Sequence, residues 1–552
     1  GHISSKRLHC YQDTLNRQTD KYPESQKTRT LFGTIFSSSA TVAPMTNTPK
    51  THVHTGVTDE ALFVSARQRQ DPVSIHVKIL NGFGSVPGQH KDFAFNTLLL
   101  LYYSQILGLS ASWASLALGV SLVVDAVSDP LVGGWSDNFR SRFGRRHLFM
   151  LAAILPTSLS FYALFHPPTA LADAALAAWM LTFTILARLF FTFFAVPWAA
   201  MSIELSHRYE ERTSIQTYRV AVGWFVGAVF TFLMYALVFP PTENDPSGLL
   251  NPDSYAPFGT LVSVLIASWM LITTLTTLNQ IPYLARPSET LPRVRLSALI
   301  SQTISALRNR NFRMVFLAAL TTAAIAGTGL VFDVYMNLYF WEFSSEDIKW
   351  FIFAAVGAAA AFAVIAPLQR RFEKQQIVIA AVALIMLLGM TKVGFRFAGI
   401  WPDNGQPLLL PLLVLHMAVM SFAGAIAIIM YAAIIPDIVD ENEHRTGLRQ
   451  EGMFSAGIAF AGKSTTGLGL FVGGLLLEWV VAFPVQTQPQ TLDPDLIVRL
   501  GVVDGILVPA FSIIPILLLR QYQLNRVQLE TIQGEVRERK QRAANTRRGQ
   551  EA

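Results

Sequence analysis

The stretch SLVVDAVSDP, residues 121–130, places two acidic side chains inside a long apolar run. Asp125 and Asp129 are four residues apart, so on a helix they share one face. On a surface helix, water would solvate both carboxylates at no cost. Inside a membrane, each carboxylate costs roughly 2.5–3.5 kcal/mol on insertion scales, and the two also repel each other. If this run spans a membrane, the pair requires a positive partner.

The composition of the whole chain indicates a membrane protein. Of its 552 residues, 51% are hydrophobic and 14% are charged, whereas soluble domains carry about 25% charged residues. Strands would leave backbone groups unpaired in lipid, so we expect an all-α membrane protein. Twelve apolar runs are close to the length of about 20 residues that spans a bilayer, and twelve helices are typical of two-halved secondary transporters. The runs are 92–109, 111–135, 148–165, 174–203, 220–240, 257–281, 314–341, 351–368, 376–395, 408–436, 453–483 and 496–519.

Basic residues gather in particular connections, and this predicts the orientation. Arg and Lys are concentrated in SDNFRSRFGRRH (136–147), in the segment 282–313 and in QRRFEKQQ (369–376), whereas PPTENDPSGLLNPDSY (240–255) is acidic. By the positive-inside rule the basic connections are cytoplasmic. With an even number of helices, both termini are expected on the cytoplasmic side. The expected membrane is the plasma membrane, which in bacteria is the inner membrane.

The charge and cysteine content exclude other classes of partner. The net charge of +6 is not a nucleic-acid signature, because the basic residues lie in these connections. Cys10 is the single cysteine, so neither a disulfide framework nor a zinc site is available. No metal cluster, nucleophile motif or phosphate loop is found, so we expect no enzyme.

The runs and connections predict five parts. Residues 1–76 are polar and lack the apolar core of a signal peptide, so we expect disorder there, and a natural start at or after Met45. The expected parts are this N-terminal extension (1–76), an N-terminal six-helix bundle (77–281), a cytoplasmic linker (282–313), a C-terminal six-helix bundle (314–520) and a cytoplasmic tail (521–552).

Two connections echo each other, EERTSIQ (210–216) and EHRTGLRQ (443–450). Each would fall at the same place in one of two related halves, which predicts halves that rock about a central site. We expect a cytoplasmic gate there that locks the outward-open state. Its predicted members are Arg212, Arg445, Asp437 and Asp440.

Lys463 lies about ten residues inside the expected eleventh helix, among the small residues of FSAGIAFAGKSTTGLGLFVGG (454–474). Small residues let a second helix approach closely, and a lysine that snorkels belongs near a helix end. We therefore expect Lys463 to pair with Asp125 and Asp129. A Na⁺ ion or a shared proton would also relieve the carboxylate pair, with the Ser128 hydroxyl as a neutral ligand. A structural ion pair without transport function is the alternative.

Other charges and aromatic residues in the apolar runs are expected to serve the membrane interface. Arg188 and Asp333 are assigned to the outer ends of the fourth and seventh helices, where they would anchor those helices. The aromatic residues of YMNLYFW (335–341) are typical of an interfacial belt.

Seven motifs occur in one order along the chain. From about residue 77 to the end, the chain resembles the glycoside–pentoside–hexuronide:cation symporters of the major facilitator superfamily. The resemblance implies twelve helices in two six-helix bundles, a monomer in the lipid bilayer, and uptake of a small-molecule solute coupled to Na⁺, Li⁺ or H⁺, with no other cofactor. The motifs are KDFAFN (91–96), DAVSDPLVG (125–133), SRFGRRH (141–147), VPWAAMSIEL (196–205), ERTSIQTYR (211–219), DIVDENEHRTGLRQEGMF (437–454) and GK (462–463).

The resemblance also implies roles for single residues. Lys463 matches a lysine near the family's cation site, and Asp125 and Asp129 would hold Na⁺ if the protein is sodium-coupled. An interfacial charge is the alternative for each predicted solute contact. The implied cation site is Asp125, Ser128 and Asp129, and the implied solute contacts are Asp92 and Arg219, with Lys91 beside them.

Two departures from the family pattern concern the solute. Ala195 stands where the family has an aspartate that binds sugar hydroxyls, and Ala199 stands where it has a tryptophan that stacks on the sugar. Trp198 is one position away, on another helix face. Ser121 replaces an aspartate that usually precedes the cation motif.

These observations leave three hypotheses. The first is cation-coupled symport, by alternating access, of a small polar solute such as a glycoside, another sugar or a sugar acid. The alternative is cation-coupled transport of an amphipathic solute such as a lysophospholipid, for which Ala195 and Ala199 would leave an apolar cleft. The third is a membrane sensor that does not transport, although a sensor would be expected to lose the cation site.

Overall fold

A computed structural model describes most of the chain. The expected start at Met45 and most of the expected extension 1–76 lie outside the described residues, as does much of the linker 282–313. The described residues are 63–65, 71–139, 141, 144–169, 171–206, 208–287, 301, 304–447, 451–486 and 492–551.

The described residues form an almost entirely helical protein, as predicted. Eleven helices of the described part are long and apolar enough to cross a membrane. A twelfth, the first along the chain, is helical from Ile75 to Ile106 but is built of short α, 3-10 and π segments. Its expected start at residue 92 was wrong, because the polar residues that precede the apolar run are buried against neighbouring helices rather than solvated.

The first half of the chain contains six of these helices and two short strands. The strands pair antiparallel, with Val64 opposite Arg286. The elements are α1 (Ile75–Gly82), η2 (Phe83–Ser85), α2 (Val86–Phe93), η3 (Ala94–Leu98), α3 (Leu99–Leu101), η4 (Tyr102–Ile106), α4 (Ala111–Asn138), α5 (His147–Leu164), α6 (Asp173–Glu204), α7 (Tyr209–Leu233), η5 (Met234–Val238), η6 (Pro252–Ser254), α8 (Tyr255–Thr276), η7 (Leu278–Tyr283), β1 (Phe63–Ser65) and β2 (Ala285–Pro287).

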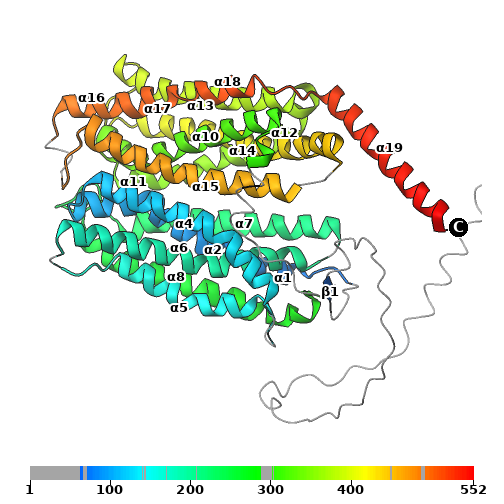
Figure 1. Ribbon diagram of the computed structural model, residues 1–552. Coiled ribbons are helices and arrows are strands. Elements are labelled where there is room, and N and C mark those ends of the chain that lie inside the picture. Colours follow the sequence, from blue (N-terminus) through cyan, green and yellow to red (C-terminus); the bar gives the residue numbers. More distant parts are fainter. Residues whose placement is uncertain are drawn as a thin grey trace, which may run out of the picture. The chain divides into compact units, whose positions relative to one another are not determined.

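The second half contains the other six and a polar C-terminal helix, α19. In Figure 1 the helices α10 to α18 gather on one side and α1 to α8 on the other, as two bundles. The elements are α10 (Arg310–Tyr335), η8 (Met336–Phe340), α11 (Ser345–Ile348), η9 (Lys349–Phe353), α12 (Ala354–Arg371), α13 (Lys374–Phe397), α14 (Leu409–Thr446), α15 (Glu451–Leu475), η10 (Leu476–Val480), α16 (Pro494–Val502), η12 (Val503–Leu507), α17 (Val508–Ala510), α18 (Ile513–Leu519) and α19 (Arg526–Glu551).

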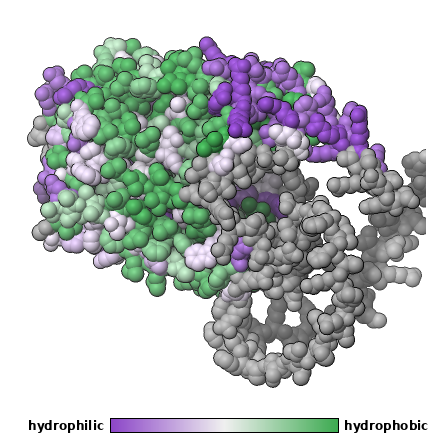
Figure 2. All heavy atoms as spheres, in the orientation of Figure 1, coloured by the Kyte–Doolittle hydropathy of each residue, from purple (hydrophilic) through white to green (hydrophobic). Residues whose placement is uncertain are grey.

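The outer surface of the bundles is apolar. Large hydrophobic side chains such as Leu155, Phe225 and Ile428 are each about 70% exposed, at 69%, 71% and 73%. Figure 2 shows hydrophobic side chains over much of the face in view, and hydrophilic ones over α19. Such a belt cannot face water at this size, so it contacts the hydrocarbon of a bilayer.

The two bundles meet where α15 packs against α4. A Cβ atom on Gly119 would lie 2.5 Å from the Gly467 carbonyl oxygen, and one on Gly474 would lie 1.8 Å from Ser115 Oγ. Glycine is therefore required at these contacts, as the run of small residues in α15 predicts. The close approach brings the middle of α15 to the middle of α4.

Hydrogen bonds join the bundles at the end of the helices that lies away from α19, called here the opposite end. The backbone N–H of Ser112 donates to Glu478 (2.8 Å), and the Gln105 amide donates to the Pro484 carbonyl (3.1 Å). The Tyr339 hydroxyl donates to the Gln105 side chain (3.3 Å). These contacts close the opposite end.

The predicted interfacial belt at 335–341 is wrong. Tyr335, Tyr339 and Trp341 are each only 1% exposed. Tyr335 and Tyr339 pack edge-on against the ring of Phe483. These aromatic residues therefore form part of the packing at the opposite end and do not lie at a membrane surface.

Candidate functional site

Lys463 of α15 reaches both aspartates of α4. Its Nζ lies 2.9 Å from Asp125 Oδ2 and 2.5 Å from Asp129 Oδ2. The aspartates share a face because they are one helical turn apart, and the glycine contacts between α4 and α15 set the distance. The single positive charge of the Lys463 ammonium balances one of the two carboxylate charges. The other carboxylate charge is not balanced by this contact.

A threonine of α6 completes the bridge on the other side. Thr192 Oγ1 donates to Asp125 Oδ1 at 2.9 Å and lies 3.3 Å from Asp129 Oδ1. Thr192 was not among the residues predicted from the sequence. The available signal was its spacing from Arg188, since residues i and i+4 form one polar stripe within an otherwise apolar helix.

The hydroxyl of Ser128 is used within α4. Ser128 Oγ donates to the backbone carbonyl of Asp125 at 3.1 Å, and the residue is 7% exposed. In this conformation the hydroxyl proton is therefore used within α4. Its role as a cation ligand stays a prediction.

Arg188 lies midway along α6, so its predicted place at the outer end of that helix is wrong. Arg188 is 3% exposed, and its guanidinium lies 4.8 Å from the centre of the Phe95 ring. It is within electrostatic reach of Asp125 and Asp92. Burial among the first, second and fourth helices explains how the membrane interior tolerates this charge.

The predicted solute contacts lie beside the aspartate pair. Lys91 Nζ is 2.5 Å from Asp92 Oδ1. Arg219 of α7 lies 4.2 Å from the centre of the Trp198 ring, and its guanidinium donates to Gln216 at 3.2 Å. The indole N–H of Trp198 donates to the Asn81 carbonyl, so this ring is held in the helix packing and offers no free stacking surface.

All these charged groups face one cavity of about 670 Å³, called here the Asp125 cavity. Ala195 and Ala199 also line it, and it extends along α6 to Ile203, near the end of the helices that carries α19. Four of its charged residues are cationic and three are anionic, which leaves a surplus of one positive charge. They are Lys91, Arg188, Arg219, Lys463, Asp92, Asp125 and Asp129.

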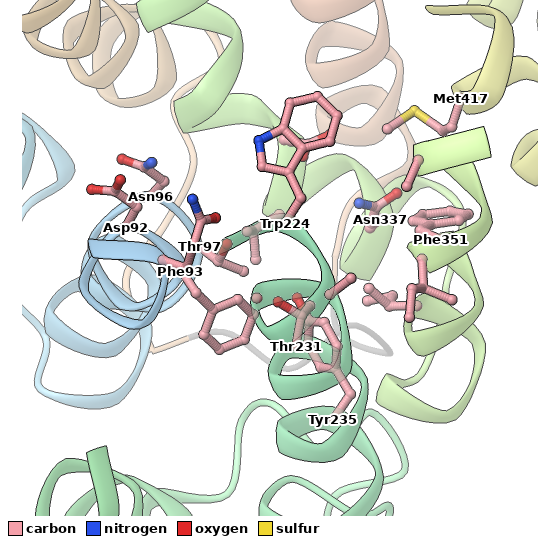
Figure 3. A pocket seen from close by; sticks show the side chains of 18 of the residues that line it. Asp92, Phe93, Asn96, Thr97, Trp224, Thr231, Tyr235, Asn337, Phe351 and Met417 are labelled. Atoms are coloured by element: carbon pink, nitrogen blue, oxygen red, sulfur yellow. The ribbon is translucent and has the colours of Figure 1, made fainter. Parts of the chain in front are cut away.

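Asp92 also lines a second cavity of about 470 Å³, called here the Asp333 cavity. Asp333 lies near the outer end of its helix, as expected, but its side chain lines this cavity, so the prediction that it serves the membrane interface is wrong. In Figure 3, Asp92, Asn96 and Trp224 of the first half face Asn337 and Phe351 of the second. The two cavities together lie between the bundles.

Three of the predicted gate residues, Asp437, Asp440 and Arg212, contact groups outside the predicted gate in this conformation. Asp437 accepts two hydrogen bonds from Lys374, each 2.7 Å, and Asp440 accepts one from Gln533 of α19. Arg212, just after the connection between α6 and α7, donates from Nε to the Ser206 carbonyl at 2.8 Å. Arg445 lies just before the connection between α14 and α15 and is exposed.

A buried cluster at the same end ties α4, α5 and α6 together. Arg145 and Arg146 both contact Glu204, the latter at 2.6 Å, and Arg146 also lies 3.0 Å from Asp137. Burial lowers the pKa of the Arg146 guanidinium from its ordinary value, and the charges of Glu204 and Asp137 oppose that shift. These arginines belong to the connection predicted to be cytoplasmic, and their contacts hold the helix ends in place.

The chain matches the profile of the family described as MFS/sugar transport protein over residues 80–526. It belongs to this family. The resemblance to cation symporters of the major facilitator superfamily is thereby confirmed, and the protein is a multi-pass membrane transporter, not an enzyme. Cation-symporter relatives imply a coupling cation and a small solute.

Several relatives carry symporter names. An uncharacterized symporter of Synechocystis, sll1374, is 24% identical over 72% of this chain and 84% of its own length. The putative glycoside/cation symporter YagG of Escherichia coli is 23% identical over 72% of this chain and 80% of its own. The sodium-dependent lysophosphatidylcholine symporter 1 of Gallus gallus is 27% identical over 33% of this chain and 35% of its own.

The fold is found in solved transporters. The nucleoside transporter NupG, as its D323A mutant, superposes with a TM-score of 0.56 over 81% of this chain and 99% of its own, at 13% identity. At this identity the likeness shows the major facilitator fold alone.

Replacing Thr192 by valine is expected to weaken cation binding about tenfold, because one hydrogen bond to a charged group contributes roughly 1.5 kcal/mol. Valine keeps the shape and removes the hydroxyl that bridges Asp125 and Asp129. The measurement is the Na⁺ or H⁺ concentration that half-saturates the cation-dependent thermal shift of the purified protein. Thr184→Val is the matched control, because the Thr184 hydroxyl on the same helix donates to its own helix at the Met180 carbonyl. Equal behaviour of the two variants would argue against a cation site at Thr192.

Proposed function

We propose that the protein is a symporter in which Asp125 and Asp129 bind the coupling cation, Na⁺ or H⁺, and that it takes up a small polar solute of the sugar or sugar-acid kind. The observation that supports this most directly is the placement of Lys463 between the two aspartates at the wall of the Asp125 cavity. A carboxylate pair that lines a cavity is reachable by a cation, whereas a purely structural pair gains nothing from such access.

In this proposal Lys463 and the coupling cation compete for the same oxygens. Before the cation binds, the Lys463 ammonium would neutralise one aspartate through its contacts with the pair. With the cation bound, it would be repelled and would leave the pair. Cation binding therefore changes the contact between α4 and α15, and this contact joins the two bundles. A cation that binds one arrangement better shifts the population toward it.

We infer that this conformation faces the cytoplasm. The opposite end is joined by hydrogen bonds across the bundles, and the Asp125 cavity extends toward the end that carries α19. The positive-inside rule places the basic connections of that end in the cytoplasm. We further propose that the protein is a monomer in a plasma membrane of the bacterial inner kind, with both termini cytoplasmic, and that its halves are 77–281 and 314–520, linked by 282–313.

The charges of the Asp125 cavity favour a polar solute. The cavity is lined by four cationic and three anionic groups. The carboxylate of a sugar acid would therefore bind Lys91, Arg188 or Arg219. The second candidate solute is a lysophospholipid. It is supported by the sequence match, over part of this chain, to a lysophosphatidylcholine symporter. The charged lining counts against an acyl chain at this place, because burial of apolar carbon beside unpaired charge is unfavourable.

Uptake by the purified full-length protein in proteoliposomes tests the proposal. The probes are radiolabelled methyl glucoside, methyl glucuronide and lysophosphatidylcholine, each with an imposed Na⁺ gradient, an imposed H⁺ gradient or neither. We expect accumulation of a sugar probe only with one of the gradients. Accumulation of lysophosphatidylcholine but of neither sugar probe would establish the second candidate. Accumulation of a probe to the same level with and without the Na⁺ and H⁺ gradients would overturn cation coupling.

The gate proposal predicts a shift between conformations. Replacing both Arg212 and Arg445 by glutamine should raise the inward-facing population about threefold, since exposed ion pairs contribute roughly 0.2–1 kcal/mol each. The populations are measured by the reaction of Ala228→Cys, a cavity residue, with a membrane-impermeant maleimide added from either side, in a background with Cys10→Ser. Arg537→Gln, an exposed arginine of α19, is the control. Unchanged populations in the double variant would contradict the gate.

A further inference from the structure

Another cavity lies within the second half, at the end of the helices that carries α19, and is called here the Arg370 cavity. Its volume of about 500 Å³ lies within the range of small-molecule sites. Its walls are the end of α12, the start of α13, Asp437 of α14 and residues 522–529, which lead into α19. It shares no lining residue with the two cavities between the bundles.

Two arginines of the Arg370 cavity have no carboxylate partner. Arg370 is exposed at the end of α12, and its guanidinium makes no ion pair or hydrogen bond to another described residue. The Arg526 guanidinium donates to the backbone carbonyls of Gln369 and Arg370. A guanidinium stays charged and carries five N–H donors in a fixed fork, which suits the binding of oxyanions. Both arginines can therefore bind an anion that enters the cavity.

The acidic residues of the cavity do not cancel this charge. Asp437 is neutralised by Lys374, whose Nζ lies 2.7 Å from each of its carboxylate oxygens. Glu373 accepts a hydrogen bond from the backbone N–H of Arg526 at 3.2 Å. Together with Arg370, the lining residues carry three positive and two negative charges. A cleft with a surplus of positive charge favours an anionic ligand.

A buried hydroxyl without a partner belongs to the same wall. Tyr522 lines the cavity and is only 5% exposed, and its hydroxyl makes no hydrogen bond within the part of the chain that the structure describes. Buried Gln375 Oε1 also has no partner there. Polar atoms inside proteins normally have partners, so unpaired ones at a cavity wall are available to a ligand.

The donor groups match a phosphate better than a carboxylate. A phosphate group presents three acceptor oxygens, whereas a carboxylate presents two in one plane. The donors Arg370, Tyr522 and Arg526 come from α12, from the connection between α18 and α19, and from α19. The rest of the wall includes the Glu373 carboxylate and the Asn525 amide, which can hydrogen-bond to hydroxyl groups. The cavity therefore suits a phosphate that is attached to a hydroxylated group.

We propose that the Arg370 cavity binds a phosphate ester that carries hydroxyl groups, with Arg370, Arg526 and Tyr522 donating to the phosphate oxygens. The site is additional to the proposed transport function, and its ligand stays outside the path of the solute. A bound ester would hold the start of α19 against the connection between α12 and α13. It would lie beside Lys374, which holds the predicted gate residue Asp437, so it would act on the second half from the end proposed to be cytoplasmic.

Thermal unfolding of the purified full-length protein in phosphatidylcholine nanodiscs tests the site. The probe is glycerol 3-phosphate, with glycerol as the uncharged comparison and glycerate as the carboxylate comparison. We expect glycerol 3-phosphate alone to raise the unfolding temperature at a given concentration. Arg370→Gln should raise its half-saturating concentration about 10- to 100-fold, because a hydrogen bond between charged groups is lost. Tyr522→Phe keeps the buried ring, removes only the hydroxyl, and should raise it several-fold.

Arg371→Gln is the matched control. Arg371 is the neighbouring exposed arginine and does not line the cavity. Both variants remove one positive charge from the same connection, so a general attraction of anions would change equally in the two. We expect the half-saturating concentration of Arg371→Gln to stay within twofold of that of the unaltered protein.

A phosphate ester can be soluble or can belong to a lipid, so a second series adds phosphatidylglycerol to the nanodiscs. Stabilisation by glycerol 3-phosphate that depends on Arg370 supports the site with a soluble ligand. Stabilisation by phosphatidylglycerol alone, with the same dependence on Arg370, supports the site with a lipid headgroup. The site is refuted if neither ester stabilises the protein, if glycerate does so equally well, or if Arg370→Gln and Arg371→Gln behave alike.

Discussion

Replacing Asp125 by asparagine is expected to abolish cation-driven accumulation of solute, with a loss of more than tenfold in proteoliposomes. Asp125 accepts hydrogen bonds from Lys463 and Thr192, each at 2.9 Å. Without its charge, Lys463 fully neutralises Asp129, and no carboxylate is left over for a cation. One lost ion contact of this kind is worth roughly 1.5–3 kcal/mol, which accounts for at least a tenfold loss of affinity.

The same variant should still exchange solute across the membrane when no gradient is imposed, because the solute contacts proposed for Lys91, Arg188 and Arg219 are unchanged. Asp129→Asn is expected to behave alike, by the same charge argument. Asp173→Asn, an exposed carboxylate in the first turn of α6, is the control and should accumulate solute normally. Full gradient-driven accumulation in both Asp125→Asn and Asp129→Asn would show that the pair has a structural role only.

Replacing Gly474 by valine is expected to hold the opposite end open and to reduce transport more than tenfold. The new Cβ would lie 1.8 Å from Ser115 Oγ and 2.8 Å from the Ala111 carbonyl oxygen. Neither α4 nor α15 has room to absorb the added carbon atoms in this conformation, and overpacking of this kind costs roughly 1–3 kcal/mol or more. A cost of 1–3 kcal/mol changes the ratio of two conformations by about 5- to 150-fold.

Maleimide labelling of Ala228→Cys from outside measures this shift, and labelling should rise in the Gly474→Val background. Gly329→Val is the matched control, since a Cβ at Gly329 of α10 meets nothing within 4 Å. Gly119→Ala, which adds one atom 2.5 Å from the Gly467 carbonyl oxygen, should give a smaller shift in the same direction. Unchanged labelling in a folded Gly474→Val protein would mean that α4 and α15 do not separate during transport.

Local patterns in the sequence were sufficient for the membrane class and for the helices. The length of an apolar run and its lack of charge are properties of the sequence itself, and they decide whether the segment can span a bilayer. The shared face of Asp125 and Asp129 follows from helix geometry. A lone lysine in the middle of an apolar helix indicates a buried acidic partner, and the structure brings Lys463 to Asp125 and Asp129.

The start of the first helix was missed for a physical reason. Polar residues at its beginning reduce its hydropathy, yet Asn81 is fully buried and bonds to Ser202 of α6. A hydropathy scale scores such a polar residue as if it were exposed to water. The sequence alone does not show which side chain of another helix will form its hydrogen bond. For the same reason Thr192 was not predicted, because its hydroxyl contacts Asp125 and Asp129 only when α6 packs beside α4.

The sequence by itself determined that this protein crosses a membrane as a bundle of helices and that Asp125 and Asp129 share a helix face. Only the tertiary structure decided which charges meet. Arg188 and Asp333, which were expected to anchor their helices at the membrane interface, line cavities between helices instead. The reason is that the depth and direction of a side chain depend on how helices far apart in the chain pack, and that packing is set by close contacts such as Gly119 with Gly467.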